Sequence, residues 1–125
     1  MNQSQYEFNI IPVPKPRMTR GDKFPPYRPC VSRYWAYAKQ MRLQANKMKY
    51  EVEPILSADF IMPMPKSWSK KKKALMNGKP HTQKPDLSNL IKAFEDVLCK
   101  NDSFIWSYKN CNKFWSETGK IIVRD

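Results

Sequence analysis

The sequence predicts a small single domain of the mixed α/β class, with a mixed β-sheet and about three helices. Apolar residues alternate along 5–11 and 55–62, which is the period of a half-buried strand. They recur at steps of three and four along 31–48 and 87–98, which is the period of an amphipathic helix. A chain of 125 residues has room for one hydrophobic core, so we expect one domain over residues 1–125.

The charge of the chain is strongly positive. It carries 23 Lys and Arg residues against 11 Asp and Glu residues, which gives a net charge of +12 and indicates a nucleic-acid partner. A membrane is the weaker candidate, because no apolar run approaches the roughly 20 residues that span a bilayer. The N-terminus has no signal-peptide pattern, and we expect a soluble cytoplasmic protein.

Histidine and cysteine usage excludes several metal centres. The chain has one histidine, so a zincin motif and a multi-histidine zinc centre are excluded. Three widely spaced cysteines suggest neither a disulfide framework nor a CxxC zinc site. His81 lies just before a Lys-Pro turn. For a lone histidine in this position, a phosphate contact or no functional role is favoured over a role as general base.

The N-terminal part combines a strand, a loop and a helix. The strand over 5–11 runs into alternating prolines, which deny backbone donors to a sheet and predict an extended loop. This loop is basic and contributes Lys15, Arg17 and Arg20. From Val31 to Met48 we expect a helix of about four turns, with Trp35 on its apolar face.

The middle of the chain predicts a strand and a short helix. The strand over 55–62 places Leu56, Ala58, Phe60 and Met62 on one face. Ser67 can cap the short helix, with Trp68 and Leu75 turned inward. This helix carries the run Lys70, Lys71, Lys72 and Lys73. Such a run is as often only a solvated face, but several separate basic segments favour a binding surface.

The clearest helix lies over 87–98. Pro85 cannot sit in a helix interior, which places Asp86 in the entry turn, at the positive end of the helix dipole. The stripe opposite the apolar face is polar and consists of Asn89, Glu95 and the aligned Ser88, Lys92 and Asp96. After the helix the chain passes Asn101 and Asp102 into an aromatic, strand-like segment over 104–115, and a strand over 120–124 ends it.

Two acids in this basic background could hold a divalent metal ion. Asp86 and Asp102 bracket the helix, and Lys92 could contact a phosphate or offset charge on a leaving oxygen. The plainer interpretation is that Asp86 is a helix cap, Lys92 and Asp96 are an ion pair, and Asp102 belongs to a turn. The tryptophans are interpreted as core or dimer contacts rather than base-stacking platforms: Trp35, Trp68, Trp106 and Trp115.

These residues resemble a known family, the RusA-type Holliday junction resolvases, which are common in prophages. The run from Lys84 to Lys92, K-P-D-L-S-N-L-I-K, is similar to the family signature K-P-D-x-D-N-L-x-K at all but one position. The family's D-x-L element is matched over 96–98, and its D-D-S element resembles Asn101-Asp102-Ser103. The segments VPKPRMTR and PMPKSWSKKKKALMNGKPHTQKPD resemble upstream parts of phage members.

The resemblance implies a homodimeric, Mg²⁺-dependent endonuclease that resolves branched DNA by paired nicks in DNA recombination and repair, with Mn²⁺ as an alternative ion and no small-molecule cofactor. A twofold dimer presents two equivalent sites to a four-way junction of matching symmetry. By position, Asp86 and Asp102 would be metal ligands and Lys92 the catalytic lysine. The residues expected to hold DNA phosphates are Lys15, Arg17, Arg20, Lys70, Lys71, Lys72, Lys73 and Lys84.

The chain departs from the family pattern at two acids. Ser88 and Asn101 stand where carboxylates are expected, and a neutral ligand weakens a site for a hard cation. Glu95 or Asp96 could substitute from the same helix. Alternatively, the chain is a weakened or inactive junction-binding protein, or Ser88 is an engineered change. A basic RNA-binding domain is a third interpretation.

Overall fold

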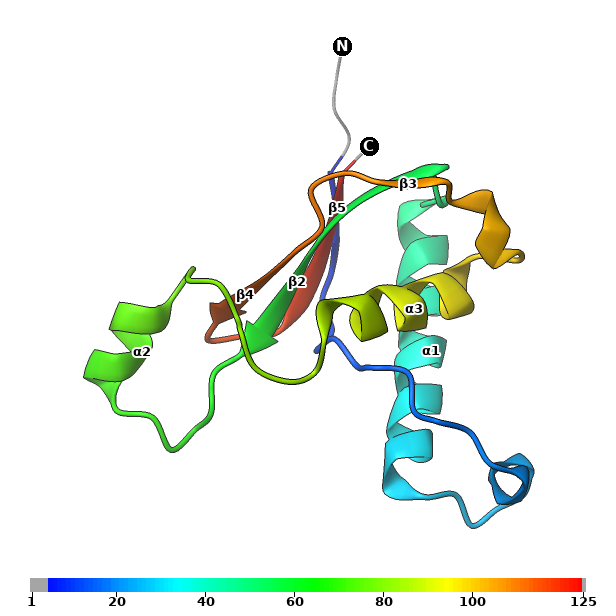
Figure 1. Cartoon of the computed structure of the whole chain (residues 1–125), viewed down its shortest axis with the longest axis horizontal. Coiled ribbons are helices and arrows are strands. Elements are labelled where there is room, and N and C mark those ends of the chain that lie inside the picture. The colour runs from blue at the N-terminus through cyan, green and yellow to red at the C-terminus, as the bar shows by residue number, and fades with distance from the viewer. Residues whose placement is uncertain (1–4, 125) are drawn as a thin grey trace.

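Strand β2 (Ile55–Pro63) is the centre of the sheet in the computed structural model of this chain, which describes residues 5–124 except the side chain of Asp102 (Figure 1). On one side β2 pairs antiparallel with β5 (Lys120–Arg124), which in turn pairs antiparallel with β1 (Gln5–Phe8). On the other side β2 pairs in parallel first with β3 (Ser107–Tyr108) and then with β4 (Asn112–Ser116). The sheet is therefore mixed, and the predicted α/β class is confirmed.

Two helices cover one face of the sheet. The helices α1 (Pro29–Met48) and α3 (Leu87–Leu98) contact one another and pack on the face that the alternation in β2 made apolar (Figure 1). The side chains at the centre of this core are fully or almost fully buried: Phe8, Met41, Leu56, Phe60, Leu90, Phe94 and Ile121. Burial of this apolar surface is the main favourable contribution to folding.

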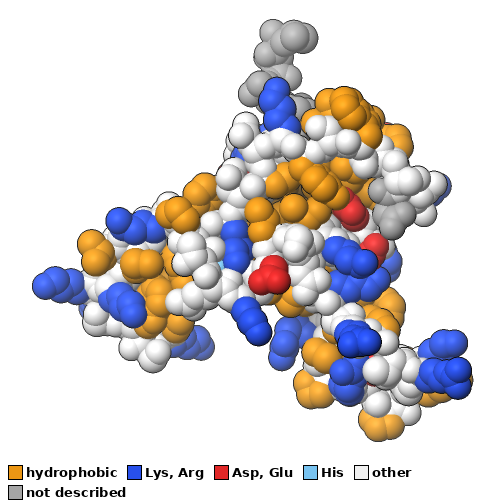
Figure 2. Space-filling view, viewed as in Figure 1, with side chains coloured by type: hydrophobic (Ala, Val, Ile, Leu, Met, Phe, Trp, Pro, Cys, Tyr) orange, Lys and Arg blue, Asp and Glu red, His pale blue; other side chains and the backbone are white. Residues whose placement is uncertain are grey.

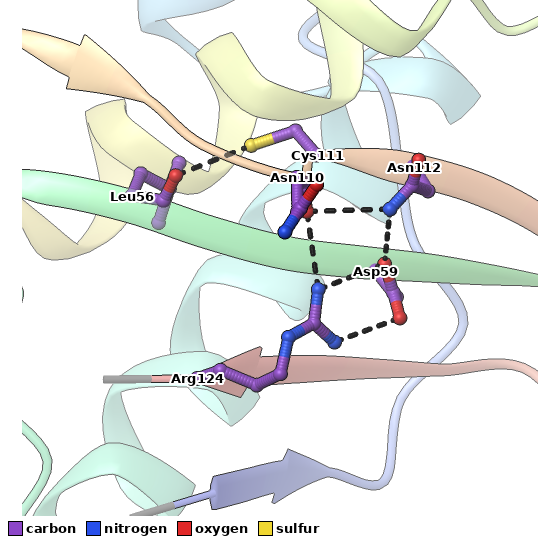
Figure 3. Close-up of polar contacts among 6 residues, drawn as sticks. All are labelled: Leu56, Asp59, Asn110, Cys111, Asn112 and Arg124. Atoms are coloured by element: carbon purple, nitrogen blue, oxygen red, sulfur yellow. Dashed lines mark hydrogen bonds and ion pairs between the residues drawn. The ribbon is translucent and has the colours of Figure 1, made fainter. Parts of the chain in front are cut away.

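The opposite face carries a polar network that joins three strands (Figure 3). The carboxylate of Asp59 accepts hydrogen bonds from Arg124 at 2.8 and 3.2 Å and from the Asn112 amide at 3.0 Å. Arg124 also donates to the backbone carbonyl oxygen of Asn110 at 3.1 Å. Asp59, Asn112 and Arg124 lie on β2, β4 and β5, so this network fixes the register in which those strands meet.

The first strand is shorter than predicted. It ends at Phe8, because the next residue turns to the side chain of Gln44 on α1. The backbone N–H of Asn9 donates to Gln44 Oε1 at 2.8 Å, and its carbonyl accepts from Gln44 Nε2 at 3.2 Å. A side-chain amide thus replaces the sheet partner that the alternating pattern implied.

Helix α1 is longer than the predicted four turns. It begins at Pro29, whose fixed φ suits the first helical position and whose missing N–H costs nothing there. Trp35, which the helical period placed on the apolar face, is 46% exposed. A core role is therefore wrong for this side chain.

The short helix α2 (Lys70–Met76) stands apart from the rest of the domain in Figure 1. Its cap is Ser69 and not Ser67, since the Ser69 hydroxyl accepts from the backbone N–H of Lys72 at 3.1 Å. The inward orientation predicted for Leu75 is wrong, because this side chain is 66% exposed. The segment before the helix is instead held by Trp68, whose ring packs 4.8 Å from that of Trp115.

The aromatic segment over 104–115 is not one strand. It contains the end of the 3-10 helix η2 (Asp102–Phe104), the short β3, and β4. The two strands are separated at Asn110, which has a φ of 57°, a left-handed conformation that Asn tolerates better than most residues. Trp106 in this segment is 74% exposed, so the core interpretation fails here too.

The predicted final strand is confirmed as β5. A Cβ atom at Gly119 would lie 2.9 Å from the backbone Cα of Ile11, so only glycine fits beneath the N-terminal segment. In the described part of the chain, no helix combines the length and the apolar character that crossing a bilayer requires.

Candidate functional site

Asp86 stands at the N-terminus of α3 with its carboxylate exposed. Its extended backbone (φ −66°, ψ 146°) makes it the N-cap, and its carbonyl oxygen accepts the first helical hydrogen bonds from Asn89 and Leu90, both at 3.1 Å. The side chain makes no capping hydrogen bond. The carboxylate is therefore not occupied by the role that most N-cap acids have.

A surface hollow of about 490 Å³ opens at this residue, and we call it the Asp86 hollow. It is lined by Pro14, Lys84, Pro85, Asp86 and Asn89. The hollow brings the N-terminal loop next to the start of α3, two segments that lie far apart in the sequence. The Asp86 carboxylate and the Asn89 side-chain amide, whose oxygen atoms can ligate a metal ion, thus line the same hollow as Lys84.

Lys113 on β4 supports the turn that precedes Asp86, and the sequence did not predict it. Its ammonium donates hydrogen bonds of 2.6 Å to the carbonyl oxygens of Gln83 and Pro85. Burial lowers the pKa of Lys113, and the negative charge of Asp86 partly opposes this. No local sequence motif marks Lys113. It reaches the turn because β4 lies beside the segment at His81, where the backbone N–H of His81 donates to the carbonyl oxygen of Lys113 at 2.9 Å.

A second hollow, of about 400 Å³, lies along α3 beyond the first. We call it the Lys92 hollow; it is lined by Leu87, Ser88, Ile91, Lys92, Glu95, Asp96 and Tyr108. The structure therefore places Ser88 and Lys92 together, as their spacing of four predicted, and puts Asp86 in the neighbouring hollow. Lys92 is exposed and accessible to a ligand.

The two acids of the Lys92 hollow already have partners. Glu95 is buried, and its carboxylate accepts a hydrogen bond from the Tyr108 hydroxyl. This bond raises the pKa of Tyr108 to about 12, with burial as a further cause. Asp96 forms an ion pair with Lys15 at 2.6 Å, which ties the N-terminal loop to α3. Lys92 and Asp96 are thus not the ion pair that the plainer interpretation expected.

Asp102 begins η2, beyond the C-terminal end of α3, whereas Asp86 lies at the other end. The helix of 12 residues is about 18 Å long, and the chain after it continues beyond its C-terminal end in Figure 1, so the backbone at the two residues is not brought together. The side chain of Asp102 lies outside the described residues, and its joint metal role with Asp86 stays a prediction. The Asn101 side chain accepts hydrogen bonds from the N–H and hydroxyl of Ser103 at 3.1 and 2.8 Å.

Basic side chains surround the two hollows. Figure 2 shows lysine and arginine over the α2 region, the centre and the N-terminal loop, with acidic side chains as isolated spots between them. Of the predicted phosphate contacts, the exposed ones are Arg17, Arg20, Lys70, Lys71, Lys72 and Lys84. Lys73 is partly buried, Lys15 is paired with Asp96, and the Lys72 ammonium lies 4.3 Å from the Trp68 ring centre.

The oxygen ligands in the Asp86 hollow suit a hard cation such as Mg²⁺ that is bound jointly by the protein and the substrate. Among residues 5–124, leaving out the Asp102 side chain, no group of three or more His, Cys, Asp or Glu side chains could enclose a metal ion. Mg²⁺ is commonly held by one or two carboxylates together with waters and substrate phosphates. The Asp86 carboxylate and the Asn89 amide oxygen fit such a partial site in chemical type.

A basic α/β domain with an exposed carboxylate beside a lysine is typical of proteins that act on nucleic acids. The comparison with protein families makes this specific, because the model of the family "Endodeoxyribonuclease RusA" matches residues 7–124, nearly the whole chain. The chain belongs to the RusA endodeoxyribonuclease family. Among curated proteins, none matches it.

Proposed function

We propose that this protein is a Mg²⁺-dependent, structure-selective endonuclease that resolves four-way DNA junctions by paired nicking, and that it acts as a homodimer. Membership of the RusA family supports the nuclease class and the branched substrate. The observation that carries the proposal within this chain is the exposed Asp86 carboxylate, which has no capping hydrogen bond and lies in a hollow beside Lys84.

Asp86 would hold Mg²⁺ or Mn²⁺, with the Asn89 amide oxygen as an additional ligand. The resemblance assigns a second ligand to Asp102, whose backbone lies beyond the other end of α3. A bound ion of this kind polarises a phosphate oxygen and lowers the pKa of a bound water. The protein itself contributes by holding these ligands in a fixed orientation. Lys113 fixes the carbonyl groups of Gln83 and Pro85, and this holds the turn from which the Asp86 carboxylate projects.

Lys92 would bind the scissile phosphate from the neighbouring hollow. Its ammonium is exposed on α3, two turns after Asp86, where it can neutralise charge that develops on the phosphate or on the leaving oxygen. The exposed lysines and arginines around both hollows would hold backbone phosphates without reading the sequence. A twofold dimer would then place one such site on each of two opposed strands.

The test is cleavage of a synthetic four-way junction by matched variants. Wild-type protein should make symmetric paired nicks with Mg²⁺ and none with EDTA. Asp86→Asn should abolish nicking and preserve junction binding, because it removes a ligand and no positive charge. Glu51→Gln makes the same chemical change at an exposed acid outside both hollows and should cleave normally. Full cleavage by Asp86→Asn would refute the role of Asp86.

A second candidate is a weakened or inactive junction-binding protein, and one observation favours it. Ser88 supplies no carboxylate, and the two acids that could replace one are engaged, Glu95 by Tyr108 and Asp96 by Lys15. Ser88→Asp separates the candidates. A large gain in cleavage indicates a disabled site. If the wild type and Ser88→Asp cleave equally well, another ligand compensates for the missing carboxylate. If neither protein cleaves, the chain acts as a binding protein.

A further inference from the structure

The N-terminal basic loop, residues 17–28, is held in one shape by hydrogen bonds to the carboxylate of Asp22. This carboxylate is almost buried and accepts from Arg28 Nε at 3.1 Å and Nη2 at 2.6 Å. It also accepts from the backbone N–H of Thr19 at 2.8 Å. The hydrogen bond from Arg28, and then that from Thr19, hold the pKa of Asp22 well below its usual value. The loop over 17–28 is therefore a preformed surface.

Between this loop and α1 lies a pocket of about 330 Å³, which we call the Trp35 pocket. It is lined by Met18, Thr19, Asp22, Lys23, Tyr27 and Trp35. Tyr27 and Trp35 are 40% and 46% exposed, so both rings are accessible to a ligand from solvent. Both carboxylate oxygens of Asp22 accept hydrogen bonds from Arg28, so the side chains left for a ligand are those of Met18, Lys23, Tyr27 and Trp35.

The charge around the Trp35 pocket is complementary to a nucleotide. Arg17, Arg20 and Lys23 are all exposed on the loop that forms its wall. Aromatic rings beside cations form the usual platform for an unpaired base, because every base has a face that stacks and a phosphate that pairs with a cation. A base inside an intact duplex cannot reach such a platform, since it is stacked between its neighbours.

The pocket lies close to the Asp86 hollow along the chain. Pro14 lines that hollow and Met18 lines the pocket, and four residues span at most about 14 Å. This distance corresponds to about four nucleotide steps along one DNA strand. The ion pair between Lys15 and Asp96 fastens the connecting segment to α3. A base displaced at a branch point near the cut would therefore be within reach.

We propose that the Trp35 pocket binds one unpaired nucleobase of the branched DNA, stacked on Trp35 and Tyr27, on the same strand as the phosphate held at Asp86. This inference rests on the proposed function and adds a source of selectivity for branched over linear DNA. Backbone contacts alone hold both forms of DNA, whereas a base is displaced at lower cost at a branch point, where stacking is interrupted, than inside a linear duplex.

The experiment compares affinities for a four-way junction and a linear duplex of equal length, at fixed salt and in EDTA so that nothing is cut. Trp35→Leu removes the ring and keeps an apolar helix former, and Trp35→Phe keeps a ring. Trp35→Leu should weaken junction binding by roughly 5- to 150-fold, the effect of losing one stacked base. Its duplex affinity should not change, and Trp35→Phe should restore much of the loss.

Trp106→Leu is the matched control, because Trp106 is also exposed but lies outside this pocket. It should bind the junction as the wild type does. Undiminished junction binding by Trp35→Leu, or an equal loss for junction and duplex, would overturn the pocket proposal while leaving the nuclease proposal intact. Equal affinity of the wild-type protein for junction and duplex would also overturn the pocket proposal, whereas failure of Mg²⁺-dependent junction cleavage would overturn the nuclease proposal. Matching melting temperatures for all variants would exclude unfolding as the cause.

Discussion

Lys113 donates a 2.6 Å hydrogen bond to the carbonyl oxygen of Pro85, the residue immediately before Asp86. A second bond of the same length goes to the carbonyl oxygen of Gln83. One ammonium on the sheet thus fixes both ends of the short turn that enters α3. The candidate ligand therefore projects from backbone that is anchored from the outside and not only by the helix that follows it.

Replacing Lys113 by Met should lower the rate of nicking more than it lowers affinity. The turn would lose its anchor, and a displacement of about 1 Å at a reacting group costs on the order of 100-fold in rate. We expect a fall of roughly 10- to 100-fold in single-turnover rate with junction binding preserved. Lys109→Met, which removes an exposed lysine from the same part of the chain, is the control. An equal loss for both variants would indicate a simple charge effect.

His81 should make stability depend on pH. Its ring is buried beside Trp115, with centroids 4.1 Å apart, and burial followed by the charge of Lys113 lowers its pKa below 6.5. Between the lowered folded-state pKa and pH 6.5, the unfolded chain therefore binds a proton that the folded chain does not. The free energy of unfolding should fall as the pH drops from 6.5 through the folded-state pKa.

Denaturant titrations at a series of pH values measure this dependence. His81 is the only histidine of the chain, so its ring resonances also report the pKa directly by NMR. His81→Phe keeps an aromatic ring against Trp115 and should remove the histidine contribution to the slope. A folded-state pKa above 6.5 would contradict the assignment.

The bond between Tyr108 and Glu95 should stabilise the domain up to high pH. The folded-state pKa of Tyr108 is about 12, above its ordinary value of 10. The stabilisation is therefore complete below pH 10 and is lost as the pH rises through about 12. Tyr108→Phe leaves the buried Glu95 without this donor, and we expect a loss of about 1–3 kcal/mol in the free energy of unfolding. An unchanged melting curve would show that the bond contributes nothing.

The lysines of α2 should contribute to the salt dependence of DNA binding. Each lysine that neutralises a phosphate adds about 0.9 to the magnitude of the slope of log K against log salt. Changing Lys70, Lys71, Lys72 and Lys73 to Gln should flatten that slope by up to about 3.6. The single variant Lys100→Gln, at the far end of α3, provides the reference. An unchanged slope would show that these four lysines face solvent and do not contact DNA phosphates.

The elements that could be predicted are those in which local pattern and burial agree. In α3, apolar residues at steps of three and four meet the core, and Leu90 and Phe94 are fully buried. In β2 the alternation identifies the buried face correctly. The same pattern misleads where no other element covers a given side chain, because the period alone does not say how far the covering surface extends. Trp35 on α1 and Leu75 on α2 are exposed for this reason.

The candidate site could be predicted only in part. Asp86, Ser88 and Lys92 lie on one helix, so their spacing placed them along α3. Lys113 comes to the site through the parallel pairing of β4 with β2, which leaves no local signal. The pairing of Asp96 with Lys15, 81 residues apart, was likewise invisible to spacing and replaced the expected pair within the helix.

The most direct measurement is the anomalous scattering of Mn²⁺ in crystals of the protein bound to a four-way junction. The account predicts a peak in the Asp86 hollow, bonded directly to an Asp86 carboxylate oxygen and in contact with a DNA phosphate. A complex that cleaves in solution but holds its ion elsewhere, away from Asp86, would contradict it.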